Sequence, residues 1–335
     1  MVWLAGKKLK NGRYTIERPL KQGRLSTTYL ATSREGEFVV LKVTNDQAIG
    51  PDEFKKLKQR FSDEAFRLVK CPSPHIVKVE APFEEENLAC IPMEFIAGTT
   101  LTEQNPRKLP EGEALRYICQ VGSALEVLHQ QNLLHRDVRP DNIMLRSRFG
   151  VSEAVLIGFG IVRDWKSERT TLGGKPTPFT APELSDSGKK RGAFTDLYSL
   201  GAVLYTLVTG KNPPKANQRK SNEQLPDLAG IHPEITQAIE KAMAFEHYDR
   251  SKSVAEWLEM LPDLPLPALT PVQPPSNPEQ SKPLTLEVKA GLAIAALTMV
   301  FGGFQGVMAI VSFVYSKESP APIQTPLKPS SSLPK

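Results

Sequence analysis

The stretch HRDVRPDN (His135–Asn142) decides how this sequence is interpreted, and it lies between two segments with helical patterns. Before it, apolar residues recur three and four positions apart, as on one face of a helix: Leu115, Ile118, Val121, Leu125 and Leu128. After it, Ser199–Val208 is almost wholly apolar, as in a helix buried on all sides. The first third of the chain is instead rich in β-branched and aromatic residues, for example at Phe38–Val43. The sequence therefore predicts a small sheet-rich part followed by a larger helical part.

The stretch His135–Asn142 fits the pattern H-R-D-x-x-x-x-N and so resembles the catalytic loop of protein kinases. The run VVLK, which ends at Lys42, resembles the lysine motif of the family's third strand. Glu64 stands where the family has the helix glutamate that pairs with this lysine. Farther along the chain, Ala181–Glu183 matches the A-P-E motif.

Two more motifs follow in the family's order. Asp196–Gly201 resembles the start of the buried helix beneath the catalytic loop, and Arg250 stands where a late arginine pairs with the A-P-E glutamate. The resemblance covers residues 9–261 and is strongest to bacterial Ser/Thr kinases. It implies an α+β fold with two lobes, a small β-rich N-lobe and a larger helical C-lobe. It also implies a buried ion pair between Glu183 and Arg250. The apolar spine that links the two lobes would comprise Leu68, Val79, His135 and Phe159.

Phosphoryl transfer requires that a nucleotide be positioned and that its charge be neutralised, largely by metal ions. The resemblance implies that Lys42 holds the α- and β-phosphates of ATP and that Glu64 holds Lys42. Asp137 would accept a hydroxyl proton or orient the nucleophile, and Asn142 would be a weak ligand for one metal ion. The other nucleotide-binding residues that the resemblance implies are Gly23, Met93 and Glu94.

The sequence departs from the family at the metal site. Where the family has D-F-G, this chain reads Gly158-Phe159-Gly160. The missing aspartate would hold Mg²⁺ at the phosphates, and glycine offers no ligand. A metal contributes several kcal/mol to the transition state, and a loss of about 4 kcal/mol slows a reaction by about three decades. We therefore expect ATP binding to be retained more readily than binding of Mg²⁺ or Mn²⁺.

Three further departures affect the phosphate-binding part. The loop G-x-G-x-x-G reads KQGRLS, so side chains at Lys21 and Ser26 hinder approach of phosphate to the backbone, unless Lys21 itself contacts phosphate. Arg139 replaces a lysine that faces the γ-phosphate, which keeps the charge but changes its geometry. In the segment before A-P-E, Thr177 takes the role of the family's threonine only after a shift in register.

These residues support three hypotheses. In the first, the chain is a pseudokinase that serves as a scaffold or regulator, with weak or no phosphotransfer. In the second, it is a Ser/Thr kinase with reduced or unusual metal use, because Lys42, Glu64, Asp137 and Asn142 all remain. In the third, it is a structural subunit of a membrane complex, in which nucleotide has no role.

The C-terminal part has a different composition. Residues 262–289 are rich in proline and predict an extended linker. Residues 290–315 have no charged side chain and exceed the roughly 20 apolar residues that a membrane-spanning helix needs. Residues 316–335 predict a short disordered tail. We expect a single-pass membrane protein with a cytosolic kinase-like domain, and a possible dimer through Gly302 and Gly306.

Composition excludes other classes of protein. The net charge of +5 is mild for 335 residues, and no dense basic block carries interleaved aromatics, so nucleic acid is not an expected partner. The three cysteines, Cys71, Cys90 and Cys119, show no metal-ligand spacing and are expected to be reduced, buried thiols.

Overall fold

The computed structural model describes residues 3–46, 49–105, 107–148, 150–159, 176–185, 188–219 and 224–265. The predicted span 290–315, with Gly302 and Gly306, the tail 316–335 and most of the linker lie outside the described residues. Among the helices that are described, none combines the length and the apolar character needed to cross a membrane.

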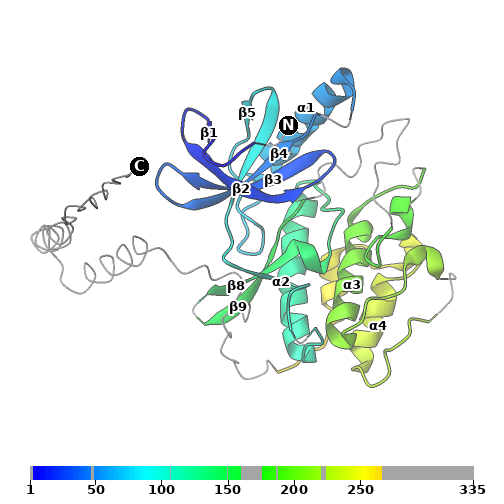
Figure 1. Ribbon diagram of the computed structural model, residues 1–335. Helices are drawn as coiled ribbons and strands as arrows, with labels where there is room; N and C mark the ends of the chain where they lie inside the picture. The colour runs from blue at the N-terminus through cyan, green and yellow to red at the C-terminus, as the bar shows by residue number, and fades with distance from the viewer. Residues whose placement is uncertain are drawn as a thin grey trace, which may run out of the picture. The chain divides into compact units, whose positions relative to one another are not determined.

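The N-terminal part contains a β-sheet (Figure 1). The sheet is antiparallel, with strand order β1-β2-β3-β4-β6-β5. Its strands are β1 (Lys8–Leu9), β2 (Tyr14–Gln22), β3 (Ser26–Ser33), β4 (Phe38–Thr44), β5 (Phe83–Glu85) and β6 (Leu88–Glu94). The predicted strand at Phe38–Val43 is thus confirmed as β4. Lys42 lies on the fourth strand rather than the third because the two-residue strand β1 precedes the others.

Helix α1 (Pro51–Leu68) packs against this sheet, in contact with β6. Its buried residues recur three and four positions apart, so one face of the helix turns toward the protein: Phe54, Leu57, Phe61, Ala65 and Leu68. The opposite face is mostly polar, although Phe66 is exposed on it. Glu64 lies between these faces and is partly exposed, which leaves its carboxylate free to reach toward the second lobe.

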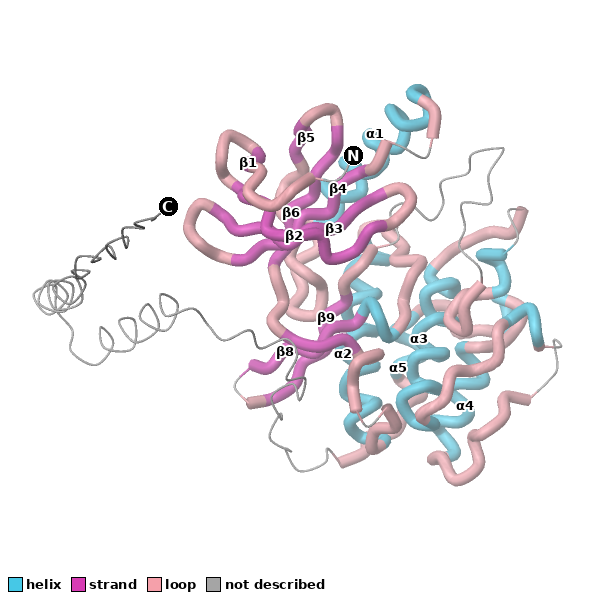
Figure 2. Tube along the Cα trace, viewed as in Figure 1, coloured by secondary structure: helices cyan, strands magenta, loops and turns pink. Residues whose placement is uncertain are grey.

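The C-terminal part is mainly helical, as Figure 2 shows. Its helices are α2 (Glu111–Gln130), α3 (Ala193–Thr209), α4 (Pro233–Ala242) and α5 (Val254–Leu258). The predicted apolar face of α2 is buried at every position named above. The run Ser199–Val208 lies within α3 and is buried throughout, so that prediction is also confirmed. Cys71 and Cys90 are buried as expected, but Cys119 is exposed because it lies on the outer face of α2.

A small sheet and several short 3-10 helices position the catalytic loop. The sheet has the order β7-β8-β9, with β7 (Gly98–Thr100), β8 (Ile143–Arg148) and β9 (Val151–Leu156). The 3-10 helices are η1 (Pro140–Asn142), η2 (Pro182–Ser185), η3 (Ala216–Gln218) and η4 (His247–Asp249). Since η1 leads directly into β8, and β9 leads directly to Gly158, the catalytic loop and the altered D-F-G segment lie at the same end of this sheet.

Candidate functional site

Asp196, at the start of α3, anchors the catalytic loop. Its carboxylate accepts hydrogen bonds from the backbone N–H of His135 at 2.8 Å and of Arg136 at 2.6 Å, and from Nε2 of His129 at 2.9 Å. Burial alone would raise the pKa of Asp196, but these donors outweigh it and the pKa is lowered. Arg136 has a φ of 61°, a conformation that is unfavourable for a side chain of this size. The bonds from the N–H groups of His135 and Arg136 to Asp196 hold the backbone of Arg136 in this conformation.

His135 links the loop to the segment before Gly158. Its Nδ1 accepts a hydrogen bond from the N–H of Asp137 at 3.3 Å, so its Nε2 carries the proton and donates to the carbonyl of Ile157 at 2.9 Å. Burial lowers the pKa of His135, which favours this neutral form. Its ring lies 4.9 Å from that of Phe159, centroid to centroid. The predicted contact between these two spine residues is therefore formed, and Leu68 and Val79 lie in the same buried cluster as Phe159.

The structure brings Asp137 and Asn142 together. Nδ2 of Asn142 donates a hydrogen bond to the backbone carbonyl of Asp137 at 2.8 Å. The carbonyl of Asn142 accepts the N–H of Ile157 at 2.8 Å, which places its side chain beside Gly158. Arg139, the third predicted catalytic residue, turns to Asp141: its Nε donates to Oδ2 at 2.7 Å and its Nη2 lies 2.6 Å from the same oxygen. Its charge is therefore partly balanced within the loop itself.

Lys42 and Glu64 lie near each other, but the expected ion pair between these two described residues is absent. Nζ of Lys42 donates to the carbonyl of Phe159 at 2.8 Å. The carboxylate of Glu64 instead pairs with Nη1 of Arg136, the residue with the left-handed backbone, at 3.4 Å. The ion pair predicted from the family pattern is thus wrong for this structure.

The electrostatic surroundings of Lys42 are unusual for a lysine. Burial lowers its pKa from 10.5 to about 8; Asp137 and Glu64 oppose this shift, and the positive charge of Lys21 adds to it. The pKa of Glu64 is raised, chiefly by burial, although Arg136 and Lys42 act in the opposite direction. The site therefore holds a desolvated cation whose hydrogen-bond acceptor is a neutral carbonyl.

Both the backbone and the space around position 158 favour glycine. Its φ is +74°, in the left-handed region that side chains other than glycine rarely adopt. A Cβ placed here would lie 2.6 Å from Cγ of Asn142 and closer still to its Oδ1. The amide of Asn142 thus lies against the backbone at the point where the family's aspartate side chain would begin.

A divalent metal does not fit this arrangement. Gly158 supplies no carboxylate, and the amide of Asn142 is turned to Asp137 and Gly158. In the described ranges, no group of three or more His, Cys, Asp or Glu side chains is placed to hold a metal ion. Hard cations such as Mg²⁺ need several oxygen ligands in near-ideal geometry. The prediction that Asn142 serves as a weak metal ligand gains no support from these contacts.

The remaining predicted nucleotide-binding residues lie along the N-terminal sheet. Gly23 forms the turn between β2 and β3, where its N–H donates to the carbonyl of Ser26 at 2.9 Å. Met93, on β6, pairs with Val40 on β4. The carboxylate of Glu94 accepts the N–H of Lys78 at 2.9 Å and lies 3.6 Å from Arg146 on β8. The carboxylate of Glu94 is therefore already engaged by other residues, and its contact with Arg146 links the two sheets.

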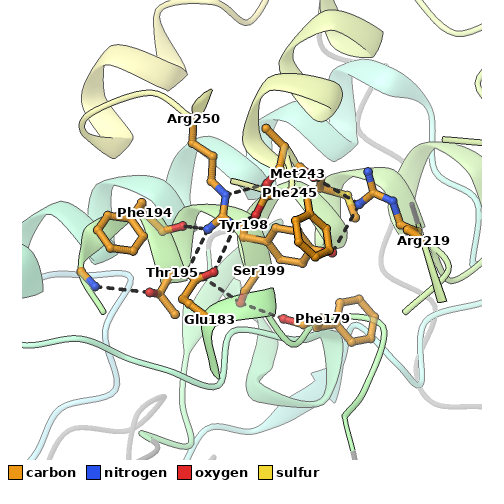
Figure 3. Close-up of polar contacts among 12 residues, drawn as sticks. Phe179, Glu183, Phe194, Thr195, Tyr198, Ser199, Arg219, Met243, Phe245 and Arg250 are labelled. Carbon is orange, nitrogen blue, oxygen red and sulfur yellow. Dashed lines mark hydrogen bonds and ion pairs between the residues drawn. The ribbon is translucent and has the colours of Figure 1, made fainter. Parts of the chain in front are cut away.

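The predicted ion pair between Glu183 and Arg250 is confirmed (Figure 3). Nη1 and Nη2 of Arg250 donate to the two carboxylate oxygens of Glu183 at 2.9 and 3.1 Å. The other donors of the guanidinium bond the carbonyls of Ala244, Phe194 and Phe245 at 2.9 to 3.1 Å. Both charged groups are buried, and each N–H of the guanidinium has an acceptor, which is the condition for a buried ion pair to be tolerated.

Sequence reasoning missed three contacts: Lys42 with the Phe159 carbonyl, Glu64 with Arg136, and His129 with Asp196. A backbone carbonyl is the same in every residue, so no letter of the sequence marks the first. Glu64 and Arg136 are oppositely charged residues 72 positions apart in the sequence. His129 and Asp196 are a histidine and a carboxylate 67 positions apart. Complementary charge alone does not select one such pair among the many that a sequence offers.

Comparisons with known proteins agree with this geometry. The family model described as "Protein kinase domain" matches residues 14–262. Among curated proteins, the chain is 28% identical to serine/threonine-protein kinase PknA of Nostoc over 82% of this chain and 51% of PknA. It is 29% identical to serine/threonine-protein kinase PkaB of Streptomyces coelicolor over 75% of this chain and 64% of PkaB. The chain spans about half of PknA and less than two thirds of PkaB.

Solved structures are similar as well. The kinase domain of Mycobacterium tuberculosis PknI matches with 26% identity and a TM-score of 0.61, over 77% of this chain and 98% of that domain. The structure "PpkA-294 apo form" matches with 26% identity and a TM-score of 0.63, over 78% of this chain and 99% of that one. The match extends over both lobes of the described fold.

Proposed function

The chain belongs to the protein kinase family, and on this premise we propose that it is a membrane-anchored pseudokinase, a scaffold or regulator that keeps a nucleotide site but transfers phosphate weakly or not at all. The observation that carries the proposal is the environment of Gly158. Its φ of +74° is strained for any other residue, and a Cβ here would meet the amide of Asn142, so an aspartate at this position needs both a strained backbone and a displaced Asn142 side chain.

The chemical consequence follows from how kinases work. Phosphoryl transfer depends on positioning and on neutralisation of phosphate charge, which metal ions largely supply. Several kcal/mol of transition-state stabilisation come from such a metal. A loss of about 4 kcal/mol lowers the rate by about three decades. Asp137 remains in the loop as a base or orienting group, but the γ-phosphate it would serve is not polarised by a metal.

Nucleotide binding has separate support. Lys42 is held on a central strand of the sheet, next to β3 and β6, with a desolvated ammonium group facing Phe159. A phosphate oxygen would replace a neutral carbonyl acceptor by a charged one, and such charge-assisted hydrogen bonds are roughly twice as strong. We propose that ATP is the nucleotide, since the family uses it, with Gly23, Met93 and Glu94 along its path.

Anchoring to the membrane is proposed from the sequence. The run Ala290–Tyr315 is uncharged and long enough for a spanning helix, and a short polar tail is easier to translocate than the kinase-like domain. Alkaline carbonate extraction of membranes from expressing cells tests this. The full chain should stay in the membrane pellet, whereas deletion of residues 290–315 should release it. Release of the full chain would reject the anchor.

One observation favours a second candidate, a Ser/Thr kinase with unusual metal use. The hydrogen bond from Asn142 to the carbonyl of Asp137 holds both residues of the catalytic loop side by side. If the Asn142 amide rotated toward ATP, it could hold a single metal ion there. This candidate predicts phosphotransfer that depends on Asp137 and on Mn²⁺ or Mg²⁺.

A phosphotransfer assay separates the two candidates. The purified full chain would be incubated with γ-labelled ATP, Mg²⁺ or Mn²⁺ and casein as a general acceptor, beside an Asp137→Asn variant. The pseudokinase proposal predicts that the wild type labels casein less than tenfold above the Asp137→Asn variant. Labelling by the wild type at least tenfold above Asp137→Asn would overturn it. If neither protein binds ATP, the chain is better explained as a structural subunit.

A further inference from the structure

Two lysines lie in one row across the N-terminal sheet. Lys21 on β2 pairs with Thr28 on β3, and Thr28 pairs with Lys42 on β4. Residues directly opposite each other on antiparallel strands project from the same face of the sheet. Neighbouring strands lie about 4.8 Å apart, so the backbones of the two lysines are about 10 Å apart. Their ammonium groups therefore act on one side of the sheet, and the charge of Lys21 is felt by Lys42.

Lys42 lacks the carboxylate partner that the family pattern gives it. Glu64 is paired with Arg136 instead, and within the described part of the chain no carboxylate forms an ion pair with Lys42. The charges of Asp137 and Glu64 favour the protonated lysine, but they do not offset its desolvation, which leaves the cation in an unfavourable environment. An anion that binds between the two lysines would supply a further counter-charge, and the carbonyl of Phe159 is the contact that it would displace.

Two departures from the family pattern change the charge of this site in the same direction. Lys21 stands where the family has the first glycine of its loop, which adds one positive charge. Gly158 stands where the family has its metal-binding aspartate, which removes one negative charge. Together the two changes equal the charge of one divalent metal ion, at a site where such an ion does not fit.

We propose that the site binds a nucleoside triphosphate in its metal-free form, with Lys21 and Lys42 taking the phosphate charge that a divalent ion neutralises elsewhere in the family. This inference rests on the proposed nucleotide binding and specifies its ligand. Without the aspartate, the outer phosphates meet no fixed carboxylate at Gly158, so a metal is not needed to separate like charges. Mg²⁺ then competes with the protein for the triphosphate.

Binding of ATP to the full chain tests the proposal by isothermal titration, once in EDTA and once with excess Mg²⁺. We expect affinity in EDTA to equal or exceed that in Mg²⁺. Lys21→Gln should weaken the EDTA affinity about five- to tenfold. Lys8→Gln is the matched control, since it removes an exposed strand lysine at the sheet's edge, and it should leave the affinity unchanged. AMP, which lacks the outer phosphates, should bind equally with or without Mg²⁺ and should not respond to Lys21→Gln.

The possible failures are distinguishable. ATP binding that requires Mg²⁺, or an EDTA affinity that Lys21→Gln does not change, overturns metal-free binding but leaves the nucleotide site standing. Absence of ATP binding in both buffers overturns this inference and the proposed nucleotide site together. Circular dichroism of each variant shows whether the fold is retained.

Discussion

Two charged sites of this fold have diverged in opposite ways. At Arg250 the family's pairing is intact: the guanidinium meets Glu183 with both terminal nitrogens and finds carbonyls for the rest (Figure 3). At Lys42 the charged groups have changed partners, and Glu64 has turned to Arg136. The first site holds the C-terminal lobe together, whereas the second would hold the phosphates. The comparison shows that one charged pair keeps the family's partners while a second set of charged residues in the same fold has different partners.

The two sites differ in how completely their buried charges are balanced by partners. Each donor of Arg250 is satisfied, so removal of any single partner leaves a buried charge and is costly. Lys42 and Glu64, both of which the structure describes, form no ion pair, and the burial of Lys42 outweighs the opposing charges of Asp137 and Glu64, which is unfavourable for stability. A buried lysine with a pKa perturbed in this way is a candidate functional residue. Mutations at the two sites should therefore change stability in opposite directions.

The largest effect is expected at the intact pair. Glu183→Ala should destabilise the fold by about 3–5 kcal/mol, because Arg250 would keep a buried charge without a counter-ion. Urea denaturation of the full chain measures this. Lys211→Ala breaks an exposed pair with Asp227 and is the matched control, expected to cost less than about 1 kcal/mol. Equal effects of the two variants would show that the buried pair contributes nothing special.

The next effect concerns the glycine that replaces the metal-binding aspartate. Gly158→Asp should lower the free energy of unfolding by about 2–4 kcal/mol. The aspartate would strain the backbone at a φ of +74°, and its Cβ would also overlap with the side chain of Asn142. Gly36→Asp controls for backbone strain alone, because Gly36 has a φ of +84° with nothing within 4 Å of a Cβ, and about 1 kcal/mol is expected there. A Gly158→Asp protein as stable as wild type, with Mg²⁺-dependent ATP binding, would mean that the site accepts a restored carboxylate.

A smaller effect of opposite sign is expected at Lys42. Its pKa of about 8 lies below the ordinary value of 10.5, so the folded state disfavours the charged lysine. The resulting loss of stability is fully present below pH 8, where the lysine is charged in both the folded and the unfolded state. Lys42→Met should therefore stabilise the protein by about 1–2 kcal/mol at pH 7, after allowance for the lost bond to Phe159. As the pH rises from about 8 to 10.5, the free energy of unfolding of the wild type should increase relative to that of the variant. Thermal denaturation across this range checks both points, and a destabilised Lys42→Met protein would contradict them.

The smallest effect is expected beside the catalytic loop. Asp141→Asn removes the carboxylate that binds Arg139, in a partly exposed pair, so stability should change by less than about 1 kcal/mol. The released guanidinium and the lost negative charge should raise ATP affinity in EDTA about two- to fivefold. Titration calorimetry measures this, and a fall in affinity would show that Arg139 does not face the phosphates.

Much of the fold could be predicted from the sequence, for identifiable reasons. The buried face of α2 follows from spacing, and the burial of α3 follows from an apolar run, so both depend on local pattern alone. The family's motifs predict the pairing of Glu183 with Arg250, because they encode a contact between distant positions. The match of such motifs in order was enough to predict a two-lobed fold.

The phosphate site was predicted less well because its contacts are not carried by residue type. Glu64 remains in place, but its partner depends on the left-handed backbone of Arg136, which no pattern in the sequence announces. Gly158 was recognised as a lost ligand, whereas its overlap with Asn142 required coordinates. The row formed by Lys21, Thr28 and Lys42 depends on strand register, which in turn depends on the irregular pairing of β2 around Pro19.

If this site holds nucleotide without a metal, the protein should bind no Mn²⁺ when it is saturated with ATP. Electron paramagnetic resonance would follow Mn²⁺ added to the full chain saturated with ATP, against ATP alone and against an Asn142→Ala variant. We predict that the protein binds no additional Mn²⁺ and that the variant gives the same spectrum as wild type. A stoichiometric protein-bound Mn²⁺ signal that Asn142→Ala abolishes would contradict the account.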